Sequence, residues 1–90
     1  MGRRDRLEVI HDILRVIADN RNSILPTPLL RAANMSSSSF AEYYTDLVAK
    51  GLVKEECDPK GRKYVTLTDK GFRYIEKYDA IRGFIDEFGL

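Results

Sequence analysis

The sequence predicts a small, mainly α-helical domain that contains one β-hairpin and ends in a long helix. Three observations support this prediction. Apolar residues recur at helical spacing near the N-terminus, two strand-like segments flank a turn at residues 58–61, and a further helical pattern occupies residues 69–90. Ninety residues provide for one hydrophobic core and hardly for a second, so a single α+β domain is expected over residues 1–90.

The composition is that of a folded protein with almost no net charge. The chain is 43% hydrophobic and 32% charged, which is not the composition of a disordered segment. Fifteen basic and fourteen acidic residues give a net charge of +1, so binding to nucleic acid would depend on the local placement of charge. No apolar run reaches about 18 residues and no signal peptide is recognisable, which predicts a soluble, cytoplasmic protein without a membrane partner.

Cysteine and histidine each occur once, as Cys57 and His11. An internal disulfide is therefore excluded, and a metal site is not expected. We interpret Cys57 as a residue at the end of a strand and His11 as a packing residue on a helix surface. Because no catalytic constellation and no glycine-rich phosphate loop is recognisable, neither an enzyme nor a cofactor is predicted.

The first helix is predicted over residues 5–20. Its apolar residues are three and four apart, which places one stripe toward the core, and the turn formers at residues 20–23 end it. The stripe consists of Leu7, Ile10, Ile13, Leu14 and Ile17, widened by Val9 and Val16.

Residues 23–25 are predicted to form a short edge strand, and a short helix is expected over residues 28–34. Thr27 is expected to cap this helix. Pro28 would take the first helical position, where its missing N–H is harmless.

The next helix is predicted over residues 36–50, and its first serines offer alternative caps. Ser39 with Glu42 matches the spacing of a capping box, whereas Ser36 as the cap allows a hydrophobic staple across it, and we prefer Ser36. Gly51 is expected to end the helix in a left-handed conformation. The residues expected to be buried are Phe40, Tyr44, Leu47 and Val48, with Tyr43 at the margin.

Residues 52–57 and 62–68 are predicted to be the two strands of the hairpin. Alternation in the second strand places Val65 and Leu67 on one face and Thr66 on the other. In the last helix, Thr68 is expected to be the cap, and Phe72 and Ile75 are placed to pack on the core.

The predicted order of helix, short strand, two helices, hairpin and helix describes a winged helix-turn-helix. The segments LVAKGLV at residues 47–53 and YVTLTDKG at residues 64–71 resemble the winged-helix DNA-binding domains of small archaeal transcription regulators. The resemblance extends from about Leu7 to the end of the chain. It is strongest to small archaeal winged-helix proteins that dimerise through a C-terminal antiparallel coiled coil. It implies that residues 36–50 enter the DNA major groove and that the hairpin is a wing against the backbone or minor groove.

The predicted DNA contacts lie on the exposed face of residues 36–50, on the preceding helix and at the wing tip. N–H groups in a first helical turn favour an anion, and small hydroxyls approach DNA closely. Glu42 can accept a hydrogen bond from cytosine N4, but phosphates more often repel a carboxylate, and Asp46 lies nearby. The residues are Thr27, Arg31, Ser37, Ser38, Ser39, Glu42, Thr45, Lys60, Arg62 and Lys63, with Arg3, Arg4 and Arg6 of a basic arm over residues 1–6 as weaker candidates.

The cations at the wing tip allow two interpretations. Hairpin tips are often charged for solubility alone, or the tip can act as a finger that reaches phosphates. The helix-turn-helix context favours the finger.

The apolar residues of 69–90 are spaced four, three, four and three apart, which is a heptad seam that must be buried, and the resemblance implies that these residues form a dimerisation helix. Folding back onto the first helix is the alternative to pairing with a second copy. The residues of this seam, including a flanking phenylalanine, are Tyr74, Tyr78, Ile81, Phe84, Ile85 and Phe88.

The sequence thus predicts a homodimeric transcription regulator that binds double-stranded DNA, with no small-molecule ligand. A protein-interaction module on the same scaffold is the alternative. The near-zero net charge and the carboxylates of Glu42 and Asp46 favour that alternative.

Overall fold

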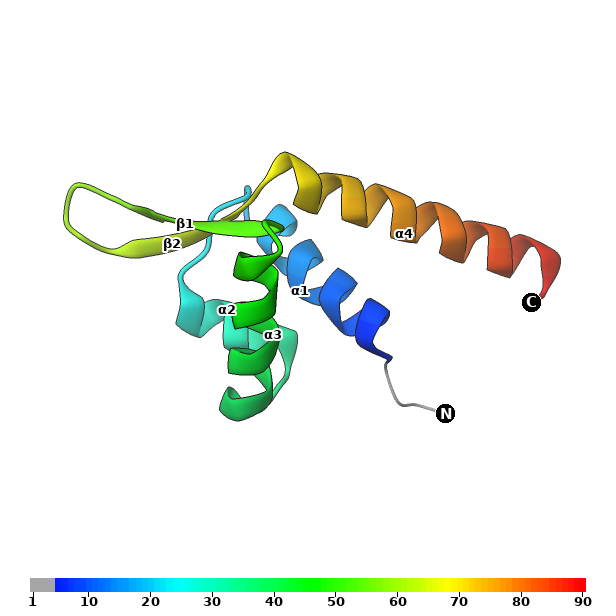
Figure 1. The fold of residues 1–90 in the computed structure, drawn as a ribbon, viewed down its shortest axis with the longest axis horizontal. Helices are drawn as coiled ribbons and strands as arrows, with labels where there is room; N and C mark the ends of the chain where they lie inside the picture. The colour runs from blue at the N-terminus through cyan, green and yellow to red at the C-terminus, as the bar shows by residue number, and fades with distance from the viewer. Residues whose placement is uncertain (1–4) are drawn as a thin grey trace.

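The computed structural model describes residues 5–90, and their elements follow one another in the predicted order (Figure 1). The mainly α-helical class with one hairpin is confirmed, whereas Arg3 and Arg4 lie outside the described residues. The hairpin and the last helix project in opposite directions, and the extents are 49 × 26 × 22 Å. The elements are α1 (Arg6–Asp19), α2 (Pro26–Ala33), α3 (Ser37–Ala49), β1 (Val53–Cys57), β2 (Lys63–Leu67) and α4 (Asp69–Phe88).

Helix α1 supplies the centre of the core. Asp5 caps it by accepting a hydrogen bond from the backbone N–H of Glu8 at 2.8 Å. Leu7 was predicted to be buried and is 57% exposed, because it lies in the first turn, at the edge of an open groove between α1 and α4. The buried stripe consists of Val9, Ile10, Ile13, Leu14 and Ile17.

Helix α2 begins two residues earlier than predicted. Pro26 takes the first helical position, Leu25 is the extended residue before it, and no side chain within residues 5–90 caps the helix. The prediction that Thr27 is the cap is therefore wrong, since an earlier proline already provides the helical φ without needing an N–H partner. The predicted edge strand reduces to one bridge, in which Ile24 and Val65 exchange backbone hydrogen bonds at 3.2 and 2.8 Å.

Helix α3 begins as predicted, with the Ser36 hydroxyl accepting a hydrogen bond from the N–H of Ser39 at 3.2 Å. Gly51 ends it with a φ of 74°. Phe40 and Leu47 are buried, but Val48, which was predicted to be buried, is 42% exposed. Val48 lies in the last turn, where helical periodicity indicates the face but not how far the neighbouring elements extend.

Strands β1 and β2 pair in antiparallel register, from Val53 opposite Leu67 to Cys57 opposite Lys63. Thr66 was placed on the face opposite the core and is nevertheless buried, because β2 contacts α1, α2 and α4. Its hydroxyl has no hydrogen-bond partner among the described residues.

Helix α4 starts at its predicted cap, where the Thr68 hydroxyl accepts a hydrogen bond from the N–H of Gly71 at 3.1 Å. Ile75 is buried as predicted, whereas Phe72 is 40% exposed and does not pack into the core. Phe72 lies in the first turn of α4, about 60° around the helix from Ile75, at the margin of the face that packs on the domain. Within residues 5–90, no helix is both long enough and apolar enough to span a membrane.

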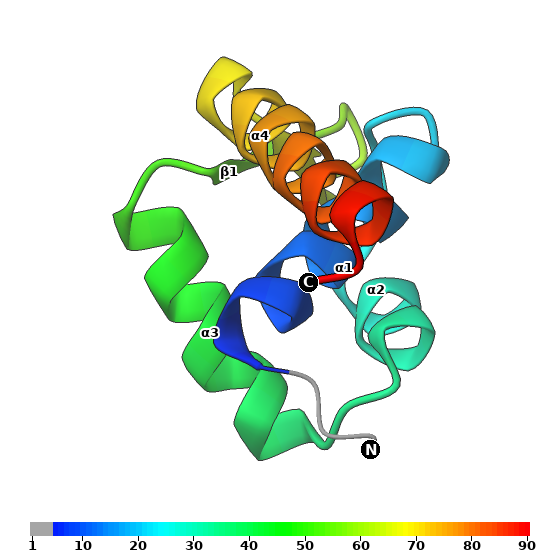
Figure 2. The same ribbon diagram turned by 90° about the vertical axis from the view of Figure 1, so that its right-hand side faces the viewer.

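The first half of α4 lies against α1 (Figures 1 and 2). The Tyr74 hydroxyl donates a hydrogen bond to the Leu7 carbonyl oxygen at 2.8 Å. His11 stacks on Tyr78 with ring centroids 4.4 Å apart, and its Nε2 lies 2.8 Å from an Asp79 carboxylate oxygen. His11 is thus a packing residue, as predicted. The second half of α4 extends beyond these contacts.

Candidate nucleic-acid interface

The predicted DNA contacts that lie within residues 5–90 are exposed, but they form two separate groups. One group lies on α2 and α3, and the other lies at the tip of the hairpin. In Figure 1, the last turn of α3 lies next to the sheet and its first turn lies farthest from it. The hairpin projects to one side. A partner that bound both groups would have to reach a face of α3 and the separate tip of the hairpin.

The first turn of α3 presents the exposed hydroxyl groups of Ser37, Ser38 and Ser39. Ser36 is occupied as the cap, and its hydroxyl oxygen lies 3.4 Å from that of Ser38. At this helix end the first N–H groups lack intrahelical partners, and the dipole favours an anion.

Further along α3, the charge of Asp46 is compensated. Lys50 donates hydrogen bonds to both carboxylate oxygens of Asp46, at 2.8 and 2.9 Å, and Arg6 forms an ion pair with it. The hydrogen bond from Lys50, together with Arg6, holds the pKa of Asp46 below its ordinary value. The Arg6 guanidinium also lies over the Tyr43 ring, 5.5 Å from its centroid. Arg6 therefore helps to compensate the charge of Asp46, a role that the sequence did not indicate, because Arg6 and Asp46 are 40 positions apart.

Glu42 and Thr45 lie on the exposed face of α3, as predicted. Among the described residues, Glu42 makes no ion pair, and neither does Arg31 on α2. The uncompensated charge on this surface is thus one carboxylate on α3 and one guanidinium on α2.

The wing tip is organised by Asp58. One of its carboxylate oxygens accepts hydrogen bonds from the backbone N–H groups of Lys60 and Arg62, at 2.9 and 2.8 Å. The other accepts the side-chain Nε–H of Arg62 at 2.9 Å. These bonds, led by the one from the Arg62 backbone, lower the pKa of Asp58, and the bond to Asp58 raises the pKa of Arg62. Gly61 completes the turn with a φ of 82°, a conformation that favours glycine.

Of the three predicted wing cations, Arg62 is already engaged. Its guanidinium bonds Asp58 and lies 5.8 Å from the centroid of the Tyr64 ring. Lys60 and Lys63 make no ion pair within residues 5–90. Sequence reasoning missed Asp58, although an aspartate that begins a turn often accepts N–H groups a few residues later.

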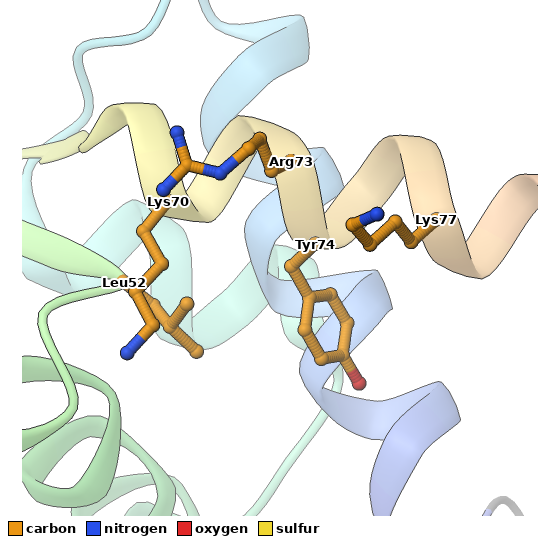
Figure 3. Close-up of a pocket in the computed structure, with 5 residues that line it drawn as sticks. All are labelled: Leu52, Lys70, Arg73, Tyr74 and Lys77. Carbon is orange, nitrogen blue, oxygen red and sulfur yellow. The ribbon is translucent and has the colours of Figure 1, made fainter.

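A shallow groove of about 290 Å³ lies along α4 (Figure 3), which projects in the opposite direction to the hairpin (Figure 1). Lys70, Arg73 and Lys77 extend from α4 along it, while Tyr74 points toward α1 and Leu52 closes one end. Lys70 donates a hydrogen bond to the Lys50 carbonyl oxygen at 2.9 Å, which links α4 to the end of α3. Among the residues that the structure describes, no carboxylate lines this groove.

The two halves of the predicted dimer seam on α4 differ in how far their side chains are exposed. Tyr74 and Tyr78 are half-buried against α1, whereas Ile85 is half-buried further along the helix. The remaining members of the seam are largely exposed: Ile81 at 59%, Phe84 at 57% and Phe88 at 60%.

Several solved structures have a similar fold. Sso10a-2, a DNA-binding protein from Sulfolobus solfataricus, has 24% sequence identity and a TM-score of 0.71, with 96% of this chain and 90% of that chain covered. F93 from STIV, a winged-helix DNA-binding protein, has 21% identity and a TM-score of 0.71, with coverages of 88% and 90%. MepR, a transcription regulator of the Staphylococcus aureus multidrug efflux pump MepA, has 17% identity and a TM-score of 0.78, with coverages of 89% and 60%. At these identities the likeness concerns the fold.

No curated protein matches the sequence. The winged helix-turn-helix family model, in contrast, matches residues 3–85, which is most of the chain. The order of α1 to α4 and the position of the hairpin agree with this match. The family is not one of enzymes. The chain is therefore a member of the winged helix-turn-helix family.

Proposed function

We propose that this protein binds double-stranded DNA as a homodimeric transcription regulator. In this proposal α3 enters the major groove and the hairpin lies along the backbone or minor groove. The observation that carries the proposal is the pairing of an exposed, hydroxyl-rich first turn of α3 with a wing whose Lys60 and Lys63 make no ion pair among the described residues. Sso10a-2 and F93 are named as DNA-binding proteins, and MepR as a transcription regulator, which supports the same use of the fold here.

The electrostatics of α3 support this role more than the sequence alone did. Asp46 would repel phosphates if it were free, but Lys50 and Arg6 compensate its charge. Glu42 remains as the carboxylate on the exposed face and is suited to accept a hydrogen bond from cytosine N4. Ser37 and Ser38 are small enough for a phosphate to approach the helix N-terminus.

Pairing of two chains through α4 is supported by the exposure of Ile81, Phe84 and Phe88. The helix also separates its charges along its length. Cations line the groove near its start, whereas its last turn contains Asp86 and no basic residue. An antiparallel second copy would bring each acidic end to the other copy's basic groove.

The length of α4 fits such a dimer. Its 20 residues make a helix of about 30 Å. Two antiparallel copies would hold their α3 helices apart by a distance of this order, and successive major grooves on one face of DNA are about 34 Å apart. The proposed dimer would therefore read two adjacent turns of the duplex.

The experiment that tests the proposal is a titration of duplex DNA with purified protein at two salt concentrations. We expect affinity to fall with added salt, since neutralising phosphates releases counterions. The variant Lys60→Ala/Lys63→Ala should bind more weakly and reduce the salt slope by about 2. Arg62 is left in place because its substitution would also disturb Asp58.

The matched control is Arg15→Ala/Arg82→Ala, which removes two exposed cations from α1 and from α4 outside the apolar seam. This control should retain the wild-type salt slope. If the folded wild-type protein shows no binding at low salt, the DNA-binding proposal fails, and Glu42, which forms no ion pair within residues 5–90, directs attention to a protein partner.

A further inference from the structure

A single side-chain hydrogen bond joins α3 to the hairpin within residues 5–90. The hydroxyl of Tyr44, on α3, donates it to an Oε of Glu55, on β1, at 2.5 Å. The Tyr44 ring is half-buried and stacks near-parallel on the buried Phe40, with centroids 5.7 Å apart and an interplanar angle of 18°. The donor is thus held in place by the core.

The acceptor is equally well placed to hold the wing. Glu55 lies opposite Val65, which is fully buried and bridges to Ile24. Three residues after Glu55 the chain reaches Asp58, which organises the tip. Burial first, and then the Glu55 carboxylate, raise the pKa of Tyr44, so the phenol remains protonated and able to donate.

We propose that Tyr44 and Glu55 are positioning residues that fix the wing relative to α3, so that both reach one DNA duplex together. This inference rests on the proposed function. Two contact elements that are held rigidly bind with a smaller loss of freedom than two elements that move independently. The hydrogen bond between Tyr44 and Glu55 supplies that rigidity at the middle of β1.

The charge of Glu55 makes the inference easy to distinguish from simple electrostatics. Removing a carboxylate from a DNA-binding surface should strengthen attraction to phosphates. If Glu55 acts as a positioning residue, its removal weakens binding instead. The two explanations therefore predict changes of opposite sign for the same variant.

The test is a DNA titration at two salt concentrations with Glu55→Ala, Glu55→Gln and Tyr44→Phe. Glu55→Ala and Tyr44→Phe should each raise Kd by about threefold to tenfold, which is typical of losing one hydrogen bond. Their salt slopes should match the wild type, since no phosphate contact is lost. Glu55→Gln keeps an acceptor oxygen for the Tyr44 hydroxyl, so it should bind at least as tightly as the wild type.

Glu56→Ala is the matched control. Glu56 is exposed on the same strand, where its carboxylate lies 3.6 Å from the Lys54 ammonium, and its removal changes the charge equally. It should tighten binding or leave it unchanged. If Glu55→Ala behaves like Glu56→Ala, the positioning role is overturned while the DNA-binding proposal stands.

A second measurement does not depend on DNA. Amide hydrogen exchange at Lys60 and Arg62 should become severalfold faster in Tyr44→Phe and remain unchanged in Glu56→Ala. Unchanged exchange in Tyr44→Phe would overturn the inference. Failure of the wild type to bind DNA, with faster exchange in Tyr44→Phe, would count against the proposed function and leave the structural coupling intact.

Discussion

The Asp58 carboxylate accepts hydrogen bonds from both the backbone N–H and the side-chain Nε–H of Arg62, at 2.8 and 2.9 Å. The same carboxylate accepts the N–H of Lys60 at 2.9 Å. One acidic side chain therefore determines the conformation of a basic finger. If the wing contacts DNA as proposed, this role accounts for a carboxylate at a tip that would otherwise be expected to carry only cations.

The first prediction concerns the order of the wing tip. Asp58→Ala removes the acceptor for two backbone N–H groups, so amide exchange at Lys60 and Arg62 should become severalfold faster. Asp58→Asn keeps one carbonyl oxygen as an acceptor and should have a smaller effect. Hydrogen-exchange NMR measures both. Exchange in Asp58→Ala equal to that of the wild type would mean that strand pairing alone holds the turn.

The second prediction is a dependence of stability on acid pH. Hydrogen bonds and nearby cations hold the pKa of Asp58 and of Asp46 below the ordinary value of 3.8. A carboxyl group whose folded-state pKa is lowered stabilises the fold above its unfolded pKa. This stabilisation is lost as the pH falls through the folded pKa. The free energy of unfolding should therefore decrease as the pH falls through about 4 and below.

Urea unfolding at a series of pH values measures this dependence. Asp58→Asn cannot titrate at this position, so its stability should decrease less steeply below about pH 4 than that of the wild type. Identical slopes for the two proteins would contradict a native-state role of the Asp58 carboxylate.

The third prediction tests the proposed dimer. Ile81→Asp introduces a charge into the exposed apolar seam of α4, so sedimentation should show a shift from dimer to monomer without loss of helical circular dichroism. Phe72→Asp is the control, because Phe72 is also partly exposed on α4 but lies nine residues, or about 180°, away. A wild-type protein that sediments as a monomer would refute the pairing, as would dissociation by both variants equally.

The sequence predicted most reliably those features that depend on neighbouring residues. Ser36 and Thr68 lie where a helix must begin, and Gly51 lies where one must end, so their roles follow from the local pattern. The hairpin followed in the same way from the turn at residues 58–61. Thr27 is the instructive exception, since two prolines compete for the same helix start and Pro26 takes it.

Predictions that depend on how far a neighbouring element extends were less reliable. Leu7, Val48 and Phe72 follow helical periodicity, yet each lies in a terminal turn or outward position that the rest of the domain does not cover. The contacts between Tyr44 and Glu55 and between Arg6 and Asp46 could not be predicted. They join separate elements, and no spacing rule relates such residues.

The last prediction concerns the direction in which α4 leaves the domain, because the geometry of the proposed dimer depends on that direction. A Cβ atom added at Gly71 would lie 2.3 Å from the Leu52 carbonyl oxygen and 3.3 Å from a Leu67 side-chain carbon. Because backbone atoms cannot yield as a flexible side chain can, Gly71→Ala should destabilise the fold by about 3 kcal/mol.

Gly83→Ala is the matched control within the same helix, since its added Cβ would meet nothing within 4 Å. It should stabilise the protein by about 0.5–1 kcal/mol, the usual advantage of alanine over glycine in a helix interior. Urea unfolding with linear extrapolation measures both changes. If Gly71→Ala proved as stable as the wild type, α4 would have to move away from Leu52 at little cost. The contact between Gly71 and Leu52 would then not fix the direction of α4. The separation of the two α3 helices in the proposed dimer would in that case not follow from the length of α4.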